Sequence, residues 1–410
     1  MKGVRIGRIV DARADVIRAK LPAAAIGEAV EIAGGVHGTV QRVCDEEVAI
    51  TPDGDIRGIR VGDAVRALSA AAVPALGLEA LGRAVNARGE ALDDGPSVNL
   101  RPRIAACAQL LPSQRALPSM PLWSGVKAID ALVTLARGAR IGVFGPAGAG
   151  KSSLLRLLER ASSADVCVVA LVGERGREAR EWFARLSSRV TIVCASSDRA
   201  AAERVTAANL AVEYAARLRS LGLHVLLIVD SLARLAAALR EVAVACGEAV
   251  GRGGFAPSVF AALARFIESA GATEDGSMTM IASVLSDAHG DDVVGESARA
   301  LLDGHIVLSS TLAHAGRYPA IDVAPSTSRL MSSVVSVSHA EDAATLRRAI
   351  CALNDSADAR SIGLEPHDPW VIAAQQSERR IEDFLRQGVE PVAAAATLEQ
   401  LHALAARIRP

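Results

Sequence analysis

The sequence predicts an α/β fold in which a small antiparallel β domain precedes a parallel sheet and a helical segment follows it. Short alternating runs separated by Gly, Pro and Asp fill the first 72 residues. Apolar runs then alternate with helical patterns from about residue 139, and only helical patterns follow about residue 337. This order is typical of a mixed α/β chain with more than one domain. We place the domains at residues 1–72, 73–337 and 338–410.

The composition predicts a large apolar core and argues against a nucleic-acid or membrane-surface binder. Of the 410 residues 50% are hydrophobic and 3% aromatic, and the net charge is −1. No uncharged apolar run reaches the roughly 18 residues of a membrane span, and MKGVRIGRIVDARADV lacks the apolar stretch of a signal peptide. The six cysteines form no C-x-x-C pair and several lie in apolar runs, which indicates buried free thiols. We expect a cytoplasmic protein without a transmembrane segment.

The first predicted elements are β-strands. They are the short runs RIGRIVDARADVIRAKL, EAVEIAG, GTVQRV, EEVAITP and IRVGDAVRAL, which recur about every ten residues. Evenly spaced short strands with turn residues between them favour a small antiparallel barrel. A connector rich in Pro and Gly follows and includes LPSQRALPSMPLWSG.

The next elements alternate between buried strands and amphipathic helices, which favours a parallel sheet covered by helices on both faces. The strand candidates are nearly continuous apolar runs at 140–145, 165–173, 189–195, 224–230 and 278–286. The helix candidates between them are 152–162, 207–222, 232–247 and 258–271. Helical patterns alone complete the chain, at 340–355, 378–388 and 396–408.

A phosphate-binding loop is predicted between the first of these strands and its helix. GPAGAGKS matches G-x-x-x-x-G-K-[ST] at every fixed position. Its glycines allow backbone N–H groups to point at phosphate oxygens, and the helix adds its positive end. Lys151 is one of only four lysines, and a compact ammonium suits a tight loop better than a guanidinium. We expect nucleotide to bind at Gly145, Pro146, Ala147, Gly148, Ala149, Gly150, Lys151, Ser152 and Ser153.

Two carboxylates stand at the ends of apolar runs. Asp230 ends the run 224–230, where it can hold Mg²⁺ through water together with the Ser152 hydroxyl. It can also cap the helix that follows. Glu174 directly follows the run 165–173, where an acid can face the γ-phosphate and orient a water molecule. The alternative for Glu174 is a solvated side chain in the charged run ERGREARE.

The segment YPAIDVAPSTSRLM holds two further candidates. Tyr318 is one of two tyrosines and can stack on a base, although an isolated tyrosine is more often part of a core. Arg329 is either a solvated arginine or an arginine finger that reaches a neighbouring subunit's nucleotide. Composition does not choose between these interpretations.

In this order, the motifs resemble the catalytic subunits of rotary-type ATPases, and most of all the ATPases of bacterial type III secretion and flagellar export. The resemblance runs from about Arg5 to the C-terminal helices and is densest in FGPAGAGKSSLL, VGERGREAREW, LLIVDSLARLAAALREVA and YPAIDVAPSTSRLM. It implies an N-terminal β-barrel domain for oligomerisation, a RecA-like P-loop domain and a C-terminal helical domain. It also implies ATP as substrate and Mg²⁺ as cofactor.

The resemblance assigns roles as well. Glu174 matches the catalytic glutamate, Tyr318 the aromatic residue that packs on adenine, and Arg329 the arginine that acts on the adjoining subunit's site. A homohexamer with sites between protomers is therefore implied. The implied partners are stalk and stator proteins of the secretion apparatus and chaperone–substrate complexes, with the ring peripheral to the inner-membrane export gate.

Two segments depart from the family's pattern. SDAHGDDV, residues 286–293, has Ser286 where the family has Glu and Val293 where it has Pro. In GRGGFAPS, Gly253 stands where an arginine is common. Both changes leave Lys151 and Glu174 in place, so they bear on turnover and loop packing rather than on nucleotide binding.

Other functions compete with an export ATPase. A Rho-like RNA translocase needs aromatic residues that stack on bases, and residues 1–72 contain no Phe, Tyr or Trp. A non-catalytic ring subunit would usually lack Glu174. A flagellar export ATPase and an ATP synthase subunit with weak turnover stay open, although IGEAVEIAG favours the injectisome branch.

Overall fold

The computed structural model describes residues 5–71, 75–98, 100–101, 109–285, 292–358, 362 and 367–409. The chain forms two compact units. The first unit consists of Met1–Gln109, Val166–Leu218 and Val229–Ser269. The second consists of Leu110–Asp165, Arg219–Ile228 and Ala270–Pro410. The domain boundaries that we placed at residues 72 and 337 stay a prediction.

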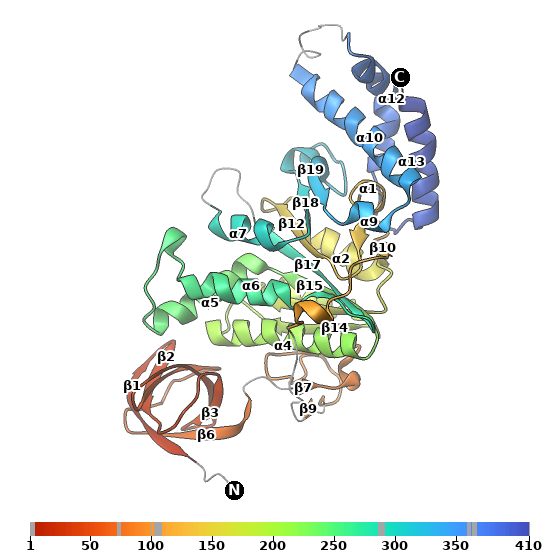
Figure 1. Ribbon diagram of the computed structural model, residues 1–410. Helices are drawn as coiled ribbons and strands as arrows, with labels where there is room; N and C mark the ends of the chain where they lie inside the picture. Colours follow the sequence, from red (N-terminus) through yellow and green to blue (C-terminus); the bar gives the residue numbers. More distant parts are fainter. Residues whose placement is uncertain are drawn as a thin grey trace. The chain divides into compact units, whose positions relative to one another are not determined.

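A closed β-barrel forms the N-terminal part of the first unit, as predicted (Figure 1). Its strands are β1 (Ile6–Arg13), β2 (Val16–Lys20), β3 (Glu28–Ile32), β4 (Val36–Cys44), β5 (Glu47–Pro52) and β6 (Ala64–Ala71). They pair antiparallel in the order β1-β2-β5-β4-β3-β6. Since successive side chains alternate between the two faces of a strand, aliphatic residues such as Ile9, Ile50 and Val65 fill the interior.

The rest of the first unit combines buried strands with longer helices. The strands are β7 (Ala75–Leu76), β8 (Ala84–Val85), β9 (Leu100–Arg101), β13 (Val166–Val172) and β14 (Val190–Ala195). The helices are α3 (Gly176–Phe183), α4 (Ala201–Ser220), α5 (Leu232–Ala245) and α6 (Pro257–Glu268), with 3-10 turns at Leu78–Ala80 and Arg252–Gly254. β13 pairs in parallel with β14, and β14 with β8. All residues of β13 and β14 are buried, as expected for strands covered on both faces.

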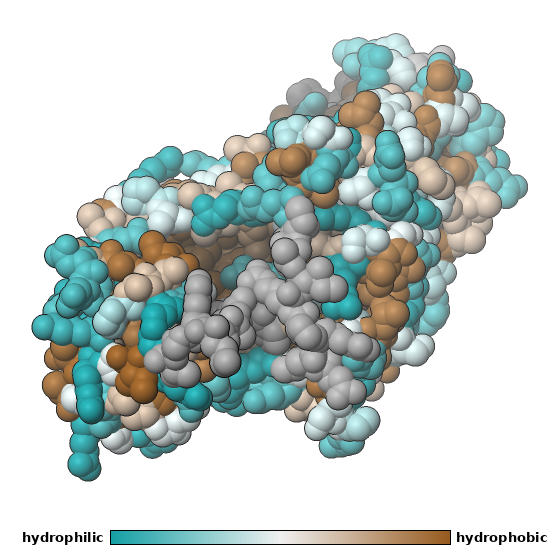
Figure 2. Space-filling view, turned by 60° about the horizontal axis from the view of Figure 1, so that its bottom comes forward, coloured by the Kyte–Doolittle hydropathy of each residue, from teal (hydrophilic) through white to brown (hydrophobic). Residues whose placement is uncertain are grey.

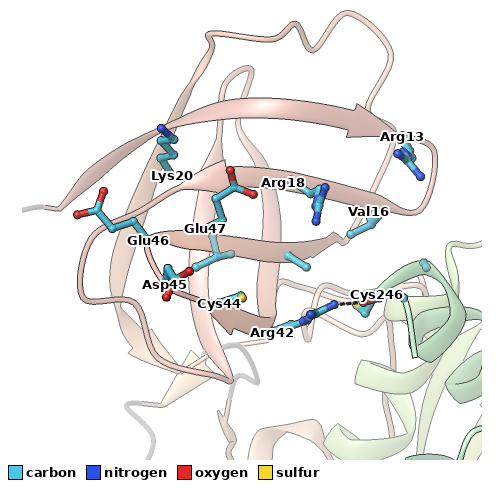
Figure 3. A pocket seen from close by; sticks show the side chains of 14 residues that line it. Arg13, Val16, Arg18, Lys20, Arg42, Cys44, Asp45, Glu46, Glu47 and Cys246 are labelled. Carbon is cyan, nitrogen blue, oxygen red and sulfur yellow. Dashed lines mark hydrogen bonds between the residues drawn. The ribbon is translucent and has the colours of Figure 1, made fainter. Parts of the chain in front are cut away.

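The outer face of the barrel packs on the end of α5 within this unit. Val16 and Ala49 of the barrel form a small apolar cluster with Cys246. Beside the cluster, Arg42 Nη1 donates to the carbonyl oxygen of Cys246 at 3.3 Å. Figure 3 shows Arg42 reaching Cys246 at one side of a pocket of about 540 Å³, with Arg18 of β2 nearby. The barrel therefore has a defined attachment to α5.

The second unit contains the strand that leads into the predicted loop. Its strands are β10 (Pro121–Leu122), β11 (Leu135–Ala136), β12 (Arg140–Gly145), β16 (Gly271–Ala272), β17 (Ser277–Leu285), β18 (Gly304–Leu308) and β19 (Ile321–Ser328). β12 lies parallel to both β17 and β18. β15 (His224–Asp230) begins in the second unit and ends in the first.

One edge of the predicted parallel sheet is antiparallel, which the sequence analysis did not predict. β19 runs antiparallel to β18, and Leu308 pairs with Ile321. The short helix α8 (Ser310–His314) returns the chain at the end where β18 finishes, so no long crossover is needed. Pro325 and the polar residues of IDVAPSTS suit an edge strand.

Helices cover and complete the second unit. They are α1 (Lys127–Leu132), α2 (Lys151–Ala161), α7 (Val293–Leu301), α8, α9 (Met331–Val334), α10 (Val337–Asp355), α12 (Pro369–Leu385) and α13 (Ala394–Ile408), with a 3-10 turn at Pro112–Gln114. α10, α12 and α13 pack on one another and on α1. The buried Asp342 of α10 lies 2.7 Å from His402 Nδ1 and accepts from Arg409 at 3.1 Å, which ties α10 to α13. The prediction of helices in the C-terminal part is confirmed.

The surface is mixed in character. On the face drawn in Figure 2, hydrophobic residues occur in small groups among hydrophilic ones, as is usual for protein surfaces. Within the described ranges, none of the helices has both the length and the apolar character that a membrane crossing requires. The predicted buried thiols are confirmed for Cys167, Cys194 and Cys246, whereas Cys44 is exposed.

Candidate active site

The predicted phosphate loop joins β12 to α2 in the second unit. β12 is buried from Ile141 to Gly145, and the chain turns through the loop into the first turn of α2. Gly148 and Gly150 have φ values of 79° and 92°. Residues with a Cβ are strained in this left-handed region, so the backbone favours glycine at both positions. Gly150 is also the N-cap of α2.

Lys151 lies over this loop. Its Nζ donates to the carbonyl oxygens of Gly145 and Pro146, each at 2.7 Å. The first turn of α2 holds no acidic residue, so the positive end of the helix is not neutralised there. The ammonium and the helix end together present positive charge that is suited to phosphate oxygens. Ser152 is half-buried in this turn, and Ser153 is exposed.

The strand beneath the loop is held rigidly. A Cβ on Gly145 would meet both Cβ and the carbonyl oxygen of Leu308 at 3.0 Å, so only glycine fits without a shift. The preceding Phe144 makes an edge contact with His305, with ring centroids 6.0 Å apart. Arg299 covers the same ring at 4.4 Å. These contacts fix where the loop begins.

The predicted acids Glu174 and Asp230 lie together in the first unit. Glu174 follows β13 and is 4% exposed, and Asp230 ends β15 and is 6% exposed. Arg234 of α5 forms an ion pair with the Glu174 carboxylate. The N-cap of α5 is Ser231, whose hydroxyl accepts from the Arg234 N–H at 3.4 Å. The capping role considered for Asp230 therefore belongs to Ser231.

The surroundings of Glu174 favour its protonated form. Burial raises the pKa of Glu174 to about 8, helped by a hydrogen bond with the Glu178 side chain and by the negative charge of Asp230. The Arg234 guanidinium opposes this and lowers the same pKa. A carboxyl with a pKa near working pH is suited to take or give a proton. The interpretation of Glu174 as a solvated surface residue is wrong, because the side chain is buried.

The two residues predicted from YPAIDVAPSTSRLM are both on the surface of the second unit. Tyr318 is 53% exposed, so it is not a core residue and its ring is accessible to a base. Arg329 directly follows β19, and its backbone N–H donates to the carbonyl oxygen of Asp303 at 2.9 Å. Its exposed guanidinium makes no hydrogen bond or ion pair with the described residues. Among the described residues, the Arg329 guanidinium is therefore anchored through its backbone and open to solvent.

Sequence reasoning assigned no role to Arg234 or Glu178, which contact Glu174. No local pattern in the sequence indicated these contacts, because Glu174 precedes α3 while Arg234 lies in the first turn of α5, a different segment. The loop, Tyr318 and Arg329 belong to the second unit, and the acidic group belongs to the first.

Comparison with known proteins identifies the family. The model of the ATP synthase alpha/beta family, nucleotide-binding domain, matches residues 125–328. A type 3 secretion system ATPase of Xanthomonas euvesicatoria is 36% identical over 97% of this chain and 94% of its own length. The chain belongs to the export ATPases of type III secretion and flagella. A flagellum-specific ATP synthase of Pseudomonas aeruginosa is 36% identical over 87% of this chain and 81% of its own length.

Solved structures agree with this family. The assembled ATPase EscN of the enteropathogenic E. coli type III secretion system superposes on this export ATPase with a TM-score of 0.91, at 34% identity, over 97% of this chain and all of the solved chain. EscN has also been solved in complex with its central stalk EscO. The predicted fold is confirmed: a β-barrel, a RecA-like P-loop core and C-terminal helices. The export ATPase family also confirms an ATP-hydrolysing enzyme.

Two of the three departures from the family's pattern, Gly253 and Val293, lie among the described residues. Gly253, where the resemblance implies an arginine, lies in the turn Arg252–Gly254 with a φ of 64°, a left-handed conformation that favours glycine. Val293 is the first residue of α7, and Asp292 caps that helix by accepting from the Gly295 N–H. Ser286 lies outside the described residues.

The ion pair between Arg234 and Glu174 leads to a prediction on pH dependence. Removing the positive charge in Arg234→Gln should raise the pKa of Glu174, by about one to three units for a lost neighbouring charge. If hydrolysis requires ionised Glu174, the pH at which kcat/KM rises should increase by the same one to three units as the pKa. The loss of activity should therefore be larger at pH 7 than at pH 9.5.

The control for this measurement is Arg240→Gln. Arg240 lies on the same helix and stacks on Phe255, 5.7 Å from the ring centroid. It should leave the pH profile of kcat/KM in place. An equal loss at every pH in Arg234→Gln would show that the ion pair does not set the ionisation of the catalytic group.

Proposed function

We propose that this export ATPase hydrolyses MgATP to drive type III protein secretion, by releasing chaperones from secretion substrates and unfolding those substrates. The observation that best supports hydrolysis is the buried carboxyl group of Glu174, which pairs with Arg234 and lies near Asp230. A ring subunit that only binds nucleotide has no need for such a costly buried acid. The assembled secretion ATPase EscN matches 97% of this chain with a TM-score of 0.91, which favours the injectisome system.

The residues take the following roles in this proposal. Glu174 orients the attacking water, and Lys151 with the loop N–H groups neutralises the β- and γ-phosphates. Tyr318 packs on the adenine ring. Arg329 of the neighbouring protomer stabilises charge on the transferred phosphoryl group.

The residues predicted for the metal suit Mg²⁺. Ser152 supplies a half-buried hydroxyl at the start of α2, and Asp230 a buried carboxylate at the end of β15. Hydroxyl and carboxylate oxygens are the ligands that Mg²⁺ prefers, with several waters retained. When bound, the ion neutralises charge between the β- and γ-phosphates.

We further propose a ring, with six protomers as the expected number, in which the barrel serves assembly. EscN has been solved as an assembled ATPase and in complex with its central stalk EscO, which supports an oligomer with a stalk partner for this export ATPase. The exposed, unpaired Arg329 supports a site completed by a neighbour. Stator proteins and chaperone–substrate complexes are the other expected partners. The ring would work in the cytoplasm, peripheral to the inner-membrane export gate.

A shared site predicts that activity depends on assembly. Specific ATPase activity should rise on the order of tenfold or more as the protein is concentrated from nanomolar to micromolar, because an arginine finger contributes about 10³ to 10⁵ in related enzymes. Steady-state hydrolysis measured alongside mass photometry tests this. Constant specific activity across a transition from monomer to ring would contradict the proposal.

A further inference from the structure

Within the first unit, the barrel and helix α4 each carry a buried carboxyl group near a cavity that both line. Asp53 follows β5 and is 8% exposed, and Glu203 in the first turn of α4 is 7% exposed. Thr51 and Ala202, which lie next to these residues in sequence, line one cavity of about 780 Å³. The end of β5 and the start of α4 therefore border the same cavity, and the charges of Asp53 and Glu203 are close enough to interact. A backbone hydrogen bond fixes Asp53 to β4: the Asp53 N–H donates to the His37 carbonyl oxygen at 2.8 Å.

Neither carboxyl has the partners that a buried charge needs. Oδ1 of Asp53 is inaccessible to solvent and has no hydrogen-bond partner in the described ranges. Glu203 makes no side-chain hydrogen bond and no ion pair at contact distance with the described residues. A buried, unpaired carboxylate is unfavourable, and such a group usually takes up a proton instead.

The charges around the pair decide where that proton sits. The facing groups come from the loop after β8 and the loop before α4, and they are Arg88, Glu90, Asp198 and Arg199. Burial and the negative charge of Glu203 raise the pKa of Asp53 to about 7, although Arg88 lowers it. Burial also raises the pKa of Glu203, but Arg199, Arg88 and the start of the helix favour its ionised form. The proton therefore resides on Asp53.

We propose that Asp53 and Glu203 form a site for a single proton that holds the barrel against α4 and empties above neutral pH. With the proton bound, one neutral and one charged carboxyl face each other. Loss of the proton leaves two negative charges in a desolvated contact, where they repel. The contact then loosens at the end of β5 and at the first turn of α4.

A backbone hydrogen bond connects this contact to the candidate active site. The Ser197 N–H, in the loop before α4, donates to the Glu174 carbonyl oxygen at 2.9 Å. Arg199 in the same loop faces Glu203. Loosening of the first turn of α4 therefore reaches the backbone of Glu174. The consequence for hydrolysis rests on the proposed catalytic role of Glu174, whereas the proton site itself does not.

Hydrogen exchange of the full chain without nucleotide tests the site. The readout is the opening constant of amides at 53–56 and 203–206 at pH 5 and pH 8, after correction for intrinsic exchange. In wild type this constant should rise on the order of 100-fold, because the Asp53 pKa is about 7 in the closed contact and about 4 when exposed. The opening constant rises with pH because, between about pH 4 and pH 7, Asp53 keeps its proton in the closed form and loses it in the open form. Above about pH 7 Asp53 is ionised in both forms, so the opening constant stops rising.

Three variants complete the test. Asp53→Asn should remove most of the rise, and Glu203→Gln should reduce it by lowering the pKa of Asp53. Asp55→Asn is the matched control, since Asp55 is exposed and pairs with Arg57, and it should keep the wild-type rise. A wild-type rise that persists in Asp53→Asn overturns the proposal. Protection regained at pH 8 on adding Mg²⁺, in wild type but not in Asp53→Asn, also overturns it, because the pair would then bind a metal.

Discussion

Glu174→Gln is expected to lower ATP hydrolysis by about 10²- to 10⁴-fold while leaving MgATP binding close to wild type. Positioned proton-transfer groups contribute about that much, and the amide of Gln cannot accept a proton from water. The substitution preserves volume, so the buried site keeps its packing. Binding persists because the phosphate contacts come from the loop of the second unit rather than from Glu174.

Single-turnover hydrolysis and equilibrium binding of a fluorescent ATP analogue separate the two effects. Glu181→Gln serves as the control, because Glu181 lies on α3 at the end of the same charged run and pairs with the exposed Arg177 at 3.9 Å. This control should retain full turnover. Full activity in Glu174→Gln would reject the catalytic assignment, and loss of binding would place Glu174 in the binding pocket instead.

A mixture of two inactive proteins is expected to recover hydrolysis if Arg329 acts between protomers. Arg329→Ala alone should lose about 10³-fold or more of the activity, in the range known for arginine fingers. In mixed rings, an Arg329→Ala protomer still supplies Glu174, and an adjoining Glu174→Gln protomer still supplies Arg329. Random mixing at equal amounts restores roughly a quarter of the interfaces, because each interface needs one protomer of each kind in the right order.

The measurement is steady-state ATPase activity against mixing ratio at constant total protein. Recovery should peak near equal amounts and vanish for either variant alone. No recovery at any ratio, in rings confirmed by mass photometry, would mean that Arg329 acts on its own protomer's nucleotide or plays no part in hydrolysis. Unchanged activity in Arg329→Ala alone would remove the shared site.

Much of the fold could be predicted because its patterns are local. The run 140–145 coincides with β12 and 224–230 with β15, since buried parallel strands appear as continuous apolar segments. β19 was missed because its polar residues and Pro325 hide an edge strand whose pairing depends on β18. The site residues themselves stay predictions, although the structure places Glu174 and Asp230 close together and buried, each at the end of a predicted strand.

The electrostatics of the site could not be predicted in the same way. Arg234 and Glu174 are 60 positions apart, and Asp53 and Glu203 are 150 apart. A pKa depends on burial and on charges that other segments bring near. No local pattern marks Asp53 as buried, and TPDGD is typical of an ordinary exposed turn.

The sequence by itself determined the types of element, the phosphate loop and the strand ends that carry Glu174 and Asp230. These follow from residue spacing and from backbone conformations that only glycine tolerates, both of which act over a few residues. Only the tertiary structure decided that Glu174 and Asp53 are buried acids while Tyr318 and Arg329 face outward. Solvent access and the local electric field at a side chain are set by distant segments that pack around it. Solvent access and field in turn determine whether the side chain binds a proton, contacts a nucleotide or contacts a neighbouring protomer.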